Sequence, residues 1–265
     1  MTDQREFFNK NYHRISAIPV SDFKIVNFKK VVGKKILNIG GGTSSDIWFL
    51  AENNDVYLLD ISETAVNIAK KNNIKGKVYD VTGKIPFKSK KFDIVILKDI
   101  LEHLLDPEKL LLESRRILKD GGYIVLSIPN HFSLWFRLRI LFGHNLLWKS
   151  IGGFDHTRHF EEWNYMHIRF FTWRGLNELI EKCGFKIKRA FWDFDTLAHY
   201  NNPQMYYTSM RIRAESNDPV AVRFLKLYRI YVILNILFPK RIRSYVVSLN
   251  PGLLCSGFYL HLAKK

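Results

Sequence analysis

Short apolar runs alternate along the chain with longer stretches in which apolar residues recur at helical spacing. Apolar runs that end near a glycine, an acidic residue or a Pro-Asn pair predict β-strands. Five such runs occur in the first half of the chain: 35–39, 56–59, a run that ends at 78–79, 92–97 and 123–128. Runs of this length are typical of strands buried on both faces of a parallel sheet. Their alternation with helices predicts an α/β fold with helices on both faces of one sheet.

The helices between these runs carry start and stop signals. Ser62 is a candidate N-cap for one helix, and residues 43–45 offer caps for another over 47–50. Asp106-Pro107 predicts a further helix start, because an acidic cap and a proline in the first turn are both favourable there. We expect Gly121-Gly122 to end that helix.

The alternation stops after Pro129-Asn130 and resumes at Thr172, another candidate N-cap. The helix after Thr172 is expected to end at Gly184. One of its faces carries four apolar residues at positions i, i+3, i+4 and i+7: Leu176, Leu179, Ile180 and Cys183. This spacing assigns Cys183 to the core. Residues 185–192 predict a sixth strand, and 257–263 predict a last strand that returns to the edge of the sheet.

The chain shows no internal repeat and no linker rich in proline or serine, so we predict one domain over residues 1–265. Three additions to the domain are expected. They are an N-terminal helical cap over 1–30, an insertion or lid over 131–170, and a helical insertion over 195–251 that is both basic and apolar.

Composition narrows the class of protein further. The apolar fraction of 47% argues against disorder, and the longest apolar stretch, 230–238, is about half the roughly 20 residues that a membrane span needs. The start of the chain lacks the apolar segment of a signal peptide, and two cysteines fit a reducing compartment. We therefore expect a cytoplasmic protein, with contact at a membrane surface as an option.

The chain is strongly basic, with 41 Lys and Arg residues against 25 Asp and Glu residues and a formal net charge of +16. Lysines spread over solvated faces would produce this charge. So would a need to attract an anionic partner such as RNA, a phosphorylated acceptor or a lipid surface.

Several polar residues follow the predicted strands directly. Ligands of open α/β sheets bind beyond the carboxyl ends of the strands, where the strand order reverses. The residues expected there are the glycine turn Gly40-Gly41-Gly42, Asp60 after the second strand, Asp80 after the third, and Lys98-Asp99 after the fourth. Glycines let a ligand approach backbone N–H groups, Asp60 can accept hydrogen bonds from a ribose diol, and Asp80 can meet an adenine amino group.

A dinucleotide fold competes with this interpretation, because Asp60 lies eighteen residues after Gly42. The third glycine of the pattern G-x-G-x-x-G is absent, however, and Ser45 follows instead. The sequence therefore favours a cofactor without phosphates.

The motifs resemble those of class I methyltransferases. Ile36 to Thr43 (ILNIGGGT) is similar to the first motif of the family, 58–62 to its ribose-binding strand, and Asp80 with 85–87 to its adenine-side segment. Residues 92–130 are similar almost throughout to its fourth and fifth strands. Residues 167–185 resemble the branch that modifies small molecules and glycans, a layout shared by quinone-pathway methyltransferases.

The resemblance implies a doubly wound, mostly parallel seven-stranded sheet with an antiparallel last strand, a Rossmann-like methyltransferase fold with helical insertions. It also implies S-adenosylmethionine as cofactor. The residues that would bind it are Asn38, Gly40, Gly41, Gly42, Asp60, Ile61, Asp80, Val81, Lys98 and His103. Asn38 departs from the family, which usually has an acidic residue there, so the cofactor's ammonium group meets no charge at that position. Glu102-His103 belongs to a family motif, and its spacing suits packing near the cofactor.

The acceptor side is expected in the insertions. His156 and His159, in the densest polar cluster of the segment after the fifth strand, are candidate general bases facing the acceptor. They are three residues apart, but no second ligand pair accompanies them, so we expect no metal site. Residues 132–142 and 221–243 combine apolar, aromatic and basic residues, which predicts a small-molecule, glycan or lipid-linked acceptor, with peripheral membrane contact.

Two other functions remain open. An RNA methyltransferase would use the basic surface to follow phosphates, although no separate RNA-binding module is evident. A binding protein without catalytic activity would keep the same fold.

Overall fold

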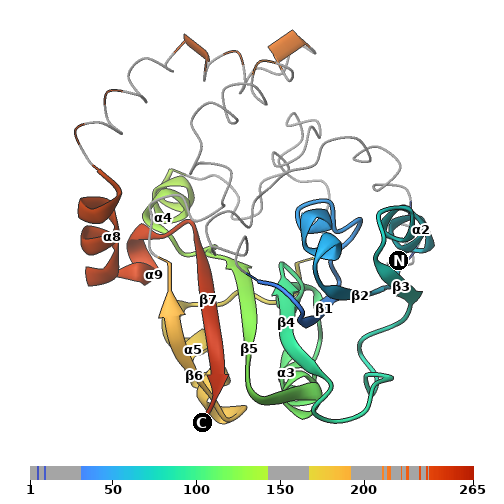
Figure 1. The fold of residues 1–265 in the computed structure, drawn as a ribbon. Helices are drawn as coiled ribbons and strands as arrows, with labels where there is room; N and C mark the ends of the chain where they lie inside the picture. Colours follow the sequence, from blue (N-terminus) through green and yellow to red (C-terminus); the bar gives the residue numbers. More distant parts are fainter. Residues whose placement is uncertain are drawn as a thin grey trace.

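The computed structural model describes residues 31–142, 167–191 and 239–265, with ten single residues between these segments and before them. Seven strands form one sheet in the order β3-β2-β1-β4-β5-β7-β6 (Figure 1). The strands are β1 (Lys35–Ile39), β2 (Asp55–Asp60), β3 (Lys75–Val78), β4 (Phe92–Lys98), β5 (Leu118–Pro129), β6 (Phe185–Ala190) and β7 (Gly257–Lys264).

Strand directions confirm the fold that the sequence predicts. β1 to β5 pair in parallel, and β7 pairs antiparallel with both β5 and β6. The strand order reverses between β1 and β4, because the chain passes from β1 outward to β3 and then returns to β4 on the other side of β1. The carboxyl ends of these two strands therefore define the expected ligand-binding edge.

The expectation that the last strand lies at the sheet edge is wrong. β7 lies between β5 and β6, and β6 forms the edge. Four apolar side chains of β7 are buried, and they cover both faces of the strand: Phe258, Tyr259, Leu260 and Leu262. β6 alternates and carries lysine and arginine on its exposed side, which is how edge strands resist pairing with other chains.

Three helices with side-chain caps cover the sheet. They are α2 (Glu63–Lys71), α3 (Pro107–Ile117) and α5 (Trp173–Lys182). Ser62, Asp106 and Thr172 each accept a hydrogen bond from a backbone N–H of the first turn, as the sequence predicts. Cys183, at the end of α5, is 1% exposed, and burial raises the pKa of its thiol to about 11, which agrees with a core role.

The predicted end of the third helix is wrong. α3 ends at Ile117, and the chain enters β5 directly at Leu118. Gly121 has a φ of +79°, and a Cβ on Gly122 would lie 2.8 Å from the carbonyl oxygen of Asp93 on β4. The two glycines therefore belong to an irregularity in the β4–β5 pairing rather than to a helix cap.

The predicted helix after the glycine turn is also different. A short 3₁₀ helix, η3 (Trp48–Glu52), replaces it, and no side chain caps this helix. Ser44, one of the candidate caps, instead binds Asn38 and has a φ of +56°. The Ser44 side chain therefore serves the turn that precedes the helix.

The core divides between the two faces of the sheet. Leu37, Val95 and Leu126 face the side that α3 and α5 cover, whereas Ile36 and Ile96 face the side of α2 and η3. Alternate residues of the same strands are thus buried on opposite faces, as expected for a sheet covered by helices on both sides.

Three further helices lie on the β7–β6 side, at the carboxyl ends of the parallel strands (Figure 1). They are α4 (Leu134–Leu141), α8 (Lys240–Leu249) and α9 (Pro251–Leu254). Asn130, at the end of β5, is fully buried and donates hydrogen bonds to the carbonyl oxygens of Gly252 and Cys255. This attaches α9 to the sheet. Within the part of the chain that the structure describes, no helix is both long enough and apolar enough to cross a membrane.

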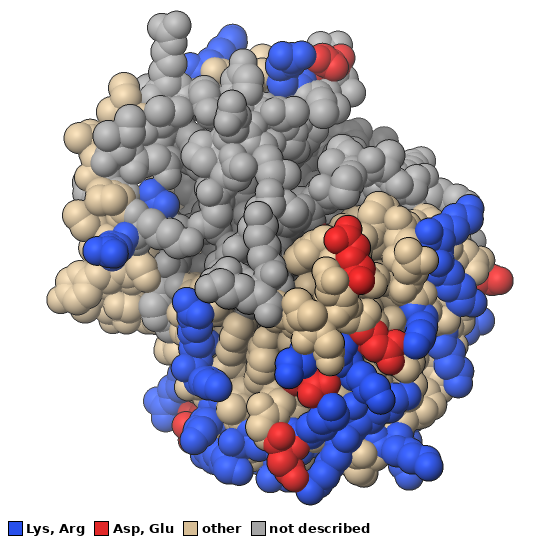
Figure 2. All heavy atoms as spheres, viewed as in Figure 1, with Lys and Arg blue, Asp and Glu red and all other residues tan. Residues whose placement is uncertain are grey.

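Positive charge gathers at the opposite end of the sheet. On the face in Figure 2, the described lysine and arginine side chains concentrate at the amino ends of the parallel strands. Several of these lysines pair with acidic side chains, including Lys75 with Asp55 and Lys119 with Asp93. Part of the net charge is therefore remote from the carboxyl edge.

Candidate functional site

The glycine turn after β1 requires glycine for its own geometry. Gly40 has a φ of +65° and Gly42 a φ of +56°, in the region that favours glycine. A Cβ on Gly40 would lie 2.3 Å from Cδ1 of Ile100, and one on Gly41 would lie 1.8 Å from Nδ2 of Asn38. The turn therefore brings backbone N–H groups to the carboxyl edge and leaves no room for side chains on its first two residues.

Asp60, at the tip of β2, fixes this turn in place. Its Oδ2 accepts a hydrogen bond from the Gly42 N–H at 2.8 Å, and its Oδ1 accepts one from the Ser62 N–H at 2.8 Å. Burial raises the pKa of the Asp60 carboxyl, and the Ser62 and Gly42 N–H groups partly oppose that shift. Sequence reasoning placed Asp60 at the site but did not reveal that it holds the turn. The Ile61 N–H also donates to this carboxylate, so most of its roughly four acceptor positions are used.

Asn38, on β1, lies beneath the turn and is 2% exposed. Its Nδ2 donates to Oγ of Ser44 at 3.0 Å, whereas its Oδ1 is buried and has no hydrogen-bond partner among the described residues. A buried acceptor without a donor costs about 1–3 kcal/mol.

Lys98, expected to face the middle of the cleft, binds an acidic residue of the turn instead. Its Nζ lies 2.9 Å from Oδ2 of Asp46, and both side chains are mostly buried. Asp99, the next residue, has a φ of +49° and accepts a hydrogen bond from Oγ of Ser127 at 3.0 Å. These contacts link the turn after β1 with the ends of β4 and β5.

The adenine-side residues occupy the loop after β3. Asp80 is exposed, and its Oδ1 accepts hydrogen bonds from the backbone N–H and the hydroxyl of Thr82, so it closes its own turn. Val81 is 9% exposed and packs in the core, while Ile61 is half-buried.

The 85–87 segment of this loop is held by α3. Arg116 donates to the carbonyl oxygens of Ile85 and Phe87 and makes two hydrogen bonds to Glu113. Glu113 in turn accepts from the Ile85 N–H at 2.8 Å.

Two residues of the predicted N-terminal cap are described, Arg5 and Asn9, and both are helical. Oδ1 of Asn9 accepts a hydrogen bond from Oγ of Ser62 at 2.6 Å. The start of the chain therefore touches the turn that follows Asp60. The rest of the 1–30 segment lies outside the described residues, as do the candidate bases His156 and His159.

The structure gathers other histidines at the carboxyl edge. His103 follows β4, in the 3₁₀ helix η4 (Leu101–His103), His131 follows β5, and His167 precedes α5. Nε2 of His131 lies 2.9 Å from Nδ1 of His167, and the His103 and His167 rings are 4.7 Å apart between centroids. Nε2 of His167 lies 3.9 Å from Oε1 of the buried Glu102. Sequence reasoning placed Glu102 and His103 near the cofactor, but it did not bring His131 and His167 beside them, because the four residues come from three separate segments.

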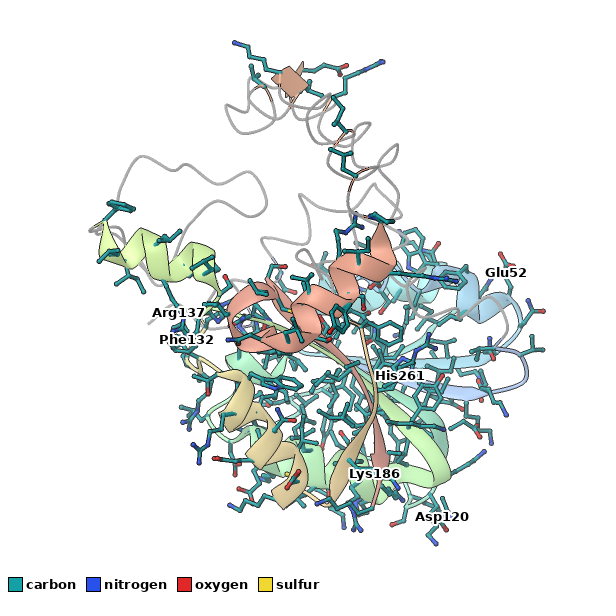
Figure 3. The ribbon with its side chains drawn as sticks, turned by 90° about the vertical axis from the view of Figure 1, so that its left-hand side faces the viewer. Glu52, Asp120, Phe132, Arg137, Lys186 and His261 are labelled. Atoms are coloured by element: carbon teal, nitrogen blue, oxygen red, sulfur yellow. The ribbon has the colours of Figure 1, made fainter. Side chains whose placement is uncertain are left out.

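A cavity of about 350 Å³ opens beside α4 and α9. Phe132 and Arg137 lie next to each other at its wall (Figure 3), and Nε of Arg137 donates to the carbonyl oxygen of Phe132. Trp173 and Asn250 also line the cavity. This part of the first predicted insertion therefore does combine aromatic and basic groups around a hollow.

A doubly wound sheet with an antiparallel seventh strand between β5 and β6 has a glycine turn and an acidic strand tip at its switch point. These features define the class of S-adenosylmethionine-dependent methyltransferases with the class I fold. The chain belongs to the methyltransferase domain family, whose model matches residues 4–190, more than half of its length.

The chain is also similar to individual proteins of other organisms. An uncharacterized protein of Methanocaldococcus jannaschii is 37% identical over 93 residues, which cover 35% of this chain and 43% of that protein. A demethylmenaquinone methyltransferase of Tropheryma whipplei is 26% identical over 167 residues, 58% of this chain and 67% of that protein. The chain thus spans less than half of the first relative.

Among solved structures, an S-adenosylmethionine-dependent methyltransferase of Thermotoga maritima superposes with a TM-score of 0.51 at 25% identity. The match covers 70% of this chain and 82% of that protein.

Proposed function

We propose that the protein transfers the methyl group of S-adenosylmethionine to a small-molecule acceptor at the carboxyl edge of β1 and β4. The single observation that carries this proposal is the buried, unsatisfied Oδ1 of Asn38 beneath a turn that only glycine can form. An acceptor atom that lacks a donor in the protein suits the ammonium group of an amino-acid ligand.

The other residues predicted to bind the cofactor would surround the Asn38 side chain. The backbone of Gly40, Gly41 and Gly42 would lie against the amino-acid portion of the cofactor. Asp60 would offer its remaining acceptor capacity to the ribose hydroxyls, next to Ile61. Asp80 and Val81 would flank the adenine, and Lys98 and His103 would line the inner end of the site.

Methyl transfer requires little more than placement. When bound, S-adenosylmethionine would supply a sulfonium methyl group that an acceptor atom displaces in line with the carbon–sulfur bond, with a neutral thioether as the leaving group. Because the sulfonium is already reactive, alignment of the reacting atoms at about 3–3.5 Å supplies most of the rate. If the acceptor is a hydroxyl, a general base adds roughly 10²–10⁴-fold, and we propose His156 or His159 for this role.

Exposed apolar residues support an apolar or lipid-linked acceptor, with a small soluble molecule or a glycan as the other members of the proposed class. Leu141 and Phe142 at the end of α4 are 75% and 74% exposed, and Tyr245 and Leu249 of α8 are 67% and 68% exposed. Both helices lie at the carboxyl edge (Figure 1). An apolar rim beside the site would suit contact with a membrane surface.

Two relatives point in the same direction by name: the demethylmenaquinone methyltransferase, and a ubiquinone/menaquinone biosynthesis C-methyltransferase of Cupriavidus taiwanensis, 32% identical over 103 residues.

The test has two parts. Calorimetry should show one S-adenosylmethionine bound per chain, and Asn38→Ala should weaken it by about 10- to 150-fold, the worth of a hydrogen bond to a charged group. Asn177→Ala, which removes a side-chain hydrogen bond within α5, is the control and should leave the affinity unchanged. Transfer of tritiated methyl to lipid, glycan, small-molecule and RNA extracts then identifies the acceptor class. If the protein does not bind S-adenosylmethionine, the proposal is refuted. If only RNA is labelled, the proposed small-molecule acceptor is refuted.

A further inference from the structure

A group of potential metal ligands stands beside the cofactor site. Glu102, His103 and His167 each offer one ligand atom, and these atoms all lie within 4.8 Å of one another. We call these three residues the Glu-His cluster. Two of them are neighbours in η4, and the third comes from the segment before α5, more than sixty positions later.

The carboxylate of Glu102 is the most unusual member. Glu102 is 0% exposed, and within the described segments neither of its side-chain oxygens has a hydrogen-bond partner in another residue. Burial raises the pKa of this carboxyl well above its ordinary value, and the nearby Asp99 adds to the shift. A carboxyl group gives up its hydration on burial, and folded proteins compensate this with donors, a counter-charge or a bound ion. No other described residue donates a hydrogen bond to this carboxyl, which leaves room for an ion.

The orientation of His167 is typical of a histidine that binds a metal ion. Nδ1 of His167 lies 2.9 Å from Nε2 of His131, so its other nitrogen, Nε2, is left to face Oε1 of Glu102 at 3.9 Å. Ligand atoms around a tetrahedral zinc ion are about 3.3–3.5 Å apart, given bonds of about 2.0–2.1 Å. The His167–Glu102 pair is about half an ångström wider than this, and a pair at the 4.8 Å limit of the cluster would have to close by about 1.4 Å. A hydrogen bond to the far nitrogen is the usual way in which a ligating histidine is oriented.

The backbone holds the cluster together independently of these side chains. The carbonyl oxygen of Glu102 accepts hydrogen bonds from the N–H groups of Ile168 and Arg169, at 2.9 and 3.1 Å. The side chain of Arg169 donates to the carbonyl oxygen of Leu105. Phe170 packs edge-on against His131, with ring centroids 4.9 Å apart. The segment that carries His167 is thus fixed against the turn that carries Glu102 and His103.

We propose that Glu102, His103 and His167 bind one divalent transition-metal ion, and that His131 orients His167. Two imidazoles and one carboxylate suit zinc, iron(II), manganese or cobalt better than calcium or magnesium, which prefer oxygen ligands. Three protein ligands leave at least one coordination position for water or for an acceptor oxygen. The metal site itself does not depend on the proposed methyl transfer.

The test uses the full chain, stripped of metal with a chelator and titrated with Zn²⁺ against a chromogenic competitor. The wild type should bind one equivalent. Glu102→Gln and His167→Gln should each weaken Zn²⁺ by at least about 100-fold, and His131→Gln by about 10- to 100-fold. His261→Gln is the matched control, a largely buried histidine on β7 outside the cluster, and should retain the wild-type affinity. Visible absorption of the Co²⁺-loaded protein should appear in the wild type and be lost in Glu102→Gln.

A separate measurement excludes a simple failure to fold. In chelator, Glu102→Gln should melt at or above the wild-type temperature, because it removes a buried carboxylate that has no donor. Added Zn²⁺ should raise the melting temperature of the wild type but not of the variant. Failure of the wild type to bind Zn²⁺ at micromolar concentration overturns the site, and so does unchanged affinity in Glu102→Gln and His167→Gln. The Zn²⁺ titration and the melting measurement involve neither cofactor nor acceptor. A negative result in them would therefore not bear on the proposed methyl transfer, which the cofactor calorimetry tests.

Discussion

Replacing Gly41 by alanine tests whether the turn after β1 is as tightly packed as its geometry indicates. The new Cβ would lie 1.8 Å from Nδ2, 2.3 Å from Cγ and 2.7 Å from Oδ1 of Asn38. Ordinary contacts between such atoms are about 3.5–4.0 Å, so the Asn38 amide has to move by roughly 1.5–2 Å. Because this side chain is 2% exposed, it cannot move into solvent without rearranging its surroundings.

The expected cost follows from what that movement breaks. The Asn38–Ser44 hydrogen bond contributes about 0.5–1.5 kcal/mol, and a buried amide left without partners costs about 1–3 kcal/mol. Gly41→Ala should therefore lower the free energy of unfolding by about 2–4 kcal/mol, a large part of the roughly 5–15 kcal/mol that a domain has. Cofactor binding should weaken as well, because Asn38 leaves its position.

Urea unfolding followed by circular dichroism measures the change. Gly83→Ala is the matched control, since a Cβ there would meet its nearest neighbours at 3.9 and 4.0 Å, and it should change stability by less than about 0.5 kcal/mol. In an Asn38→Ala background the obstructing atoms are gone, so Gly41→Ala should cost at least about 1 kcal/mol less than in the wild type. Additive effects of the two substitutions, or a Gly41→Ala variant as stable as Gly83→Ala, would refute the reasoning.

Two further predictions concern the frame around the site. Arg116→Lys should destabilise the protein by about 1–3 kcal/mol in urea unfolding, because an ammonium group cannot replace a guanidinium that serves Ile85, Phe87 and Glu113 together. Arg174→Lys, in an exposed pair with Glu178, is the control and should cost less than about 0.5 kcal/mol. Equal losses of stability in the two variants would contradict a special role for Arg116. Burial lowers the pKa of His261 to about 4, with Arg189 and Lys188 adding to the shift, so the unfolded chain takes up a proton near pH 6.5 and the folded chain does not. The stability linked to this group is present above pH 6.5 and lost as the pH falls toward 4, and His261→Phe should reduce that loss by about 1–2 kcal/mol, allowing for partial exposure. An identical pH profile of stability in wild type and variant would rule this out.

Local sequence signals predicted those features that depend on neighbouring residues. Ser62, Asp106 and Thr172 cap the helices that they precede, because the N-cap hydrogen bond spans only three positions. The glycine turn and Asp60 were predictable for a similar reason, since each directly follows a buried strand. The signals failed where a residue serves two purposes: Ser44 looked like a cap but binds Asn38, and Gly121 looked like a helix end but lies within β5.

Features that depend on tertiary contacts were not predictable. The place of β7 between β5 and β6 depends on which strand has both faces covered, which periodicity alone does not reveal. The Glu-His cluster joins residues that follow β4 and precede α5, and no spacing along the chain connects them. Lys98 could be placed at the carboxyl edge from sequence, but its partner Asp46 could not, because the turn between them had to be folded first.

The most direct test of the account is a crystal structure of the protein with S-adenosylhomocysteine. The account predicts the ligand's ammonium group within about 2.7–3.2 Å of Oδ1 of Asn38 and its ribose hydroxyls beside Asp60. An adenosyl group bound elsewhere, or an Asn38 oxygen satisfied by a donor of the protein itself, would contradict it.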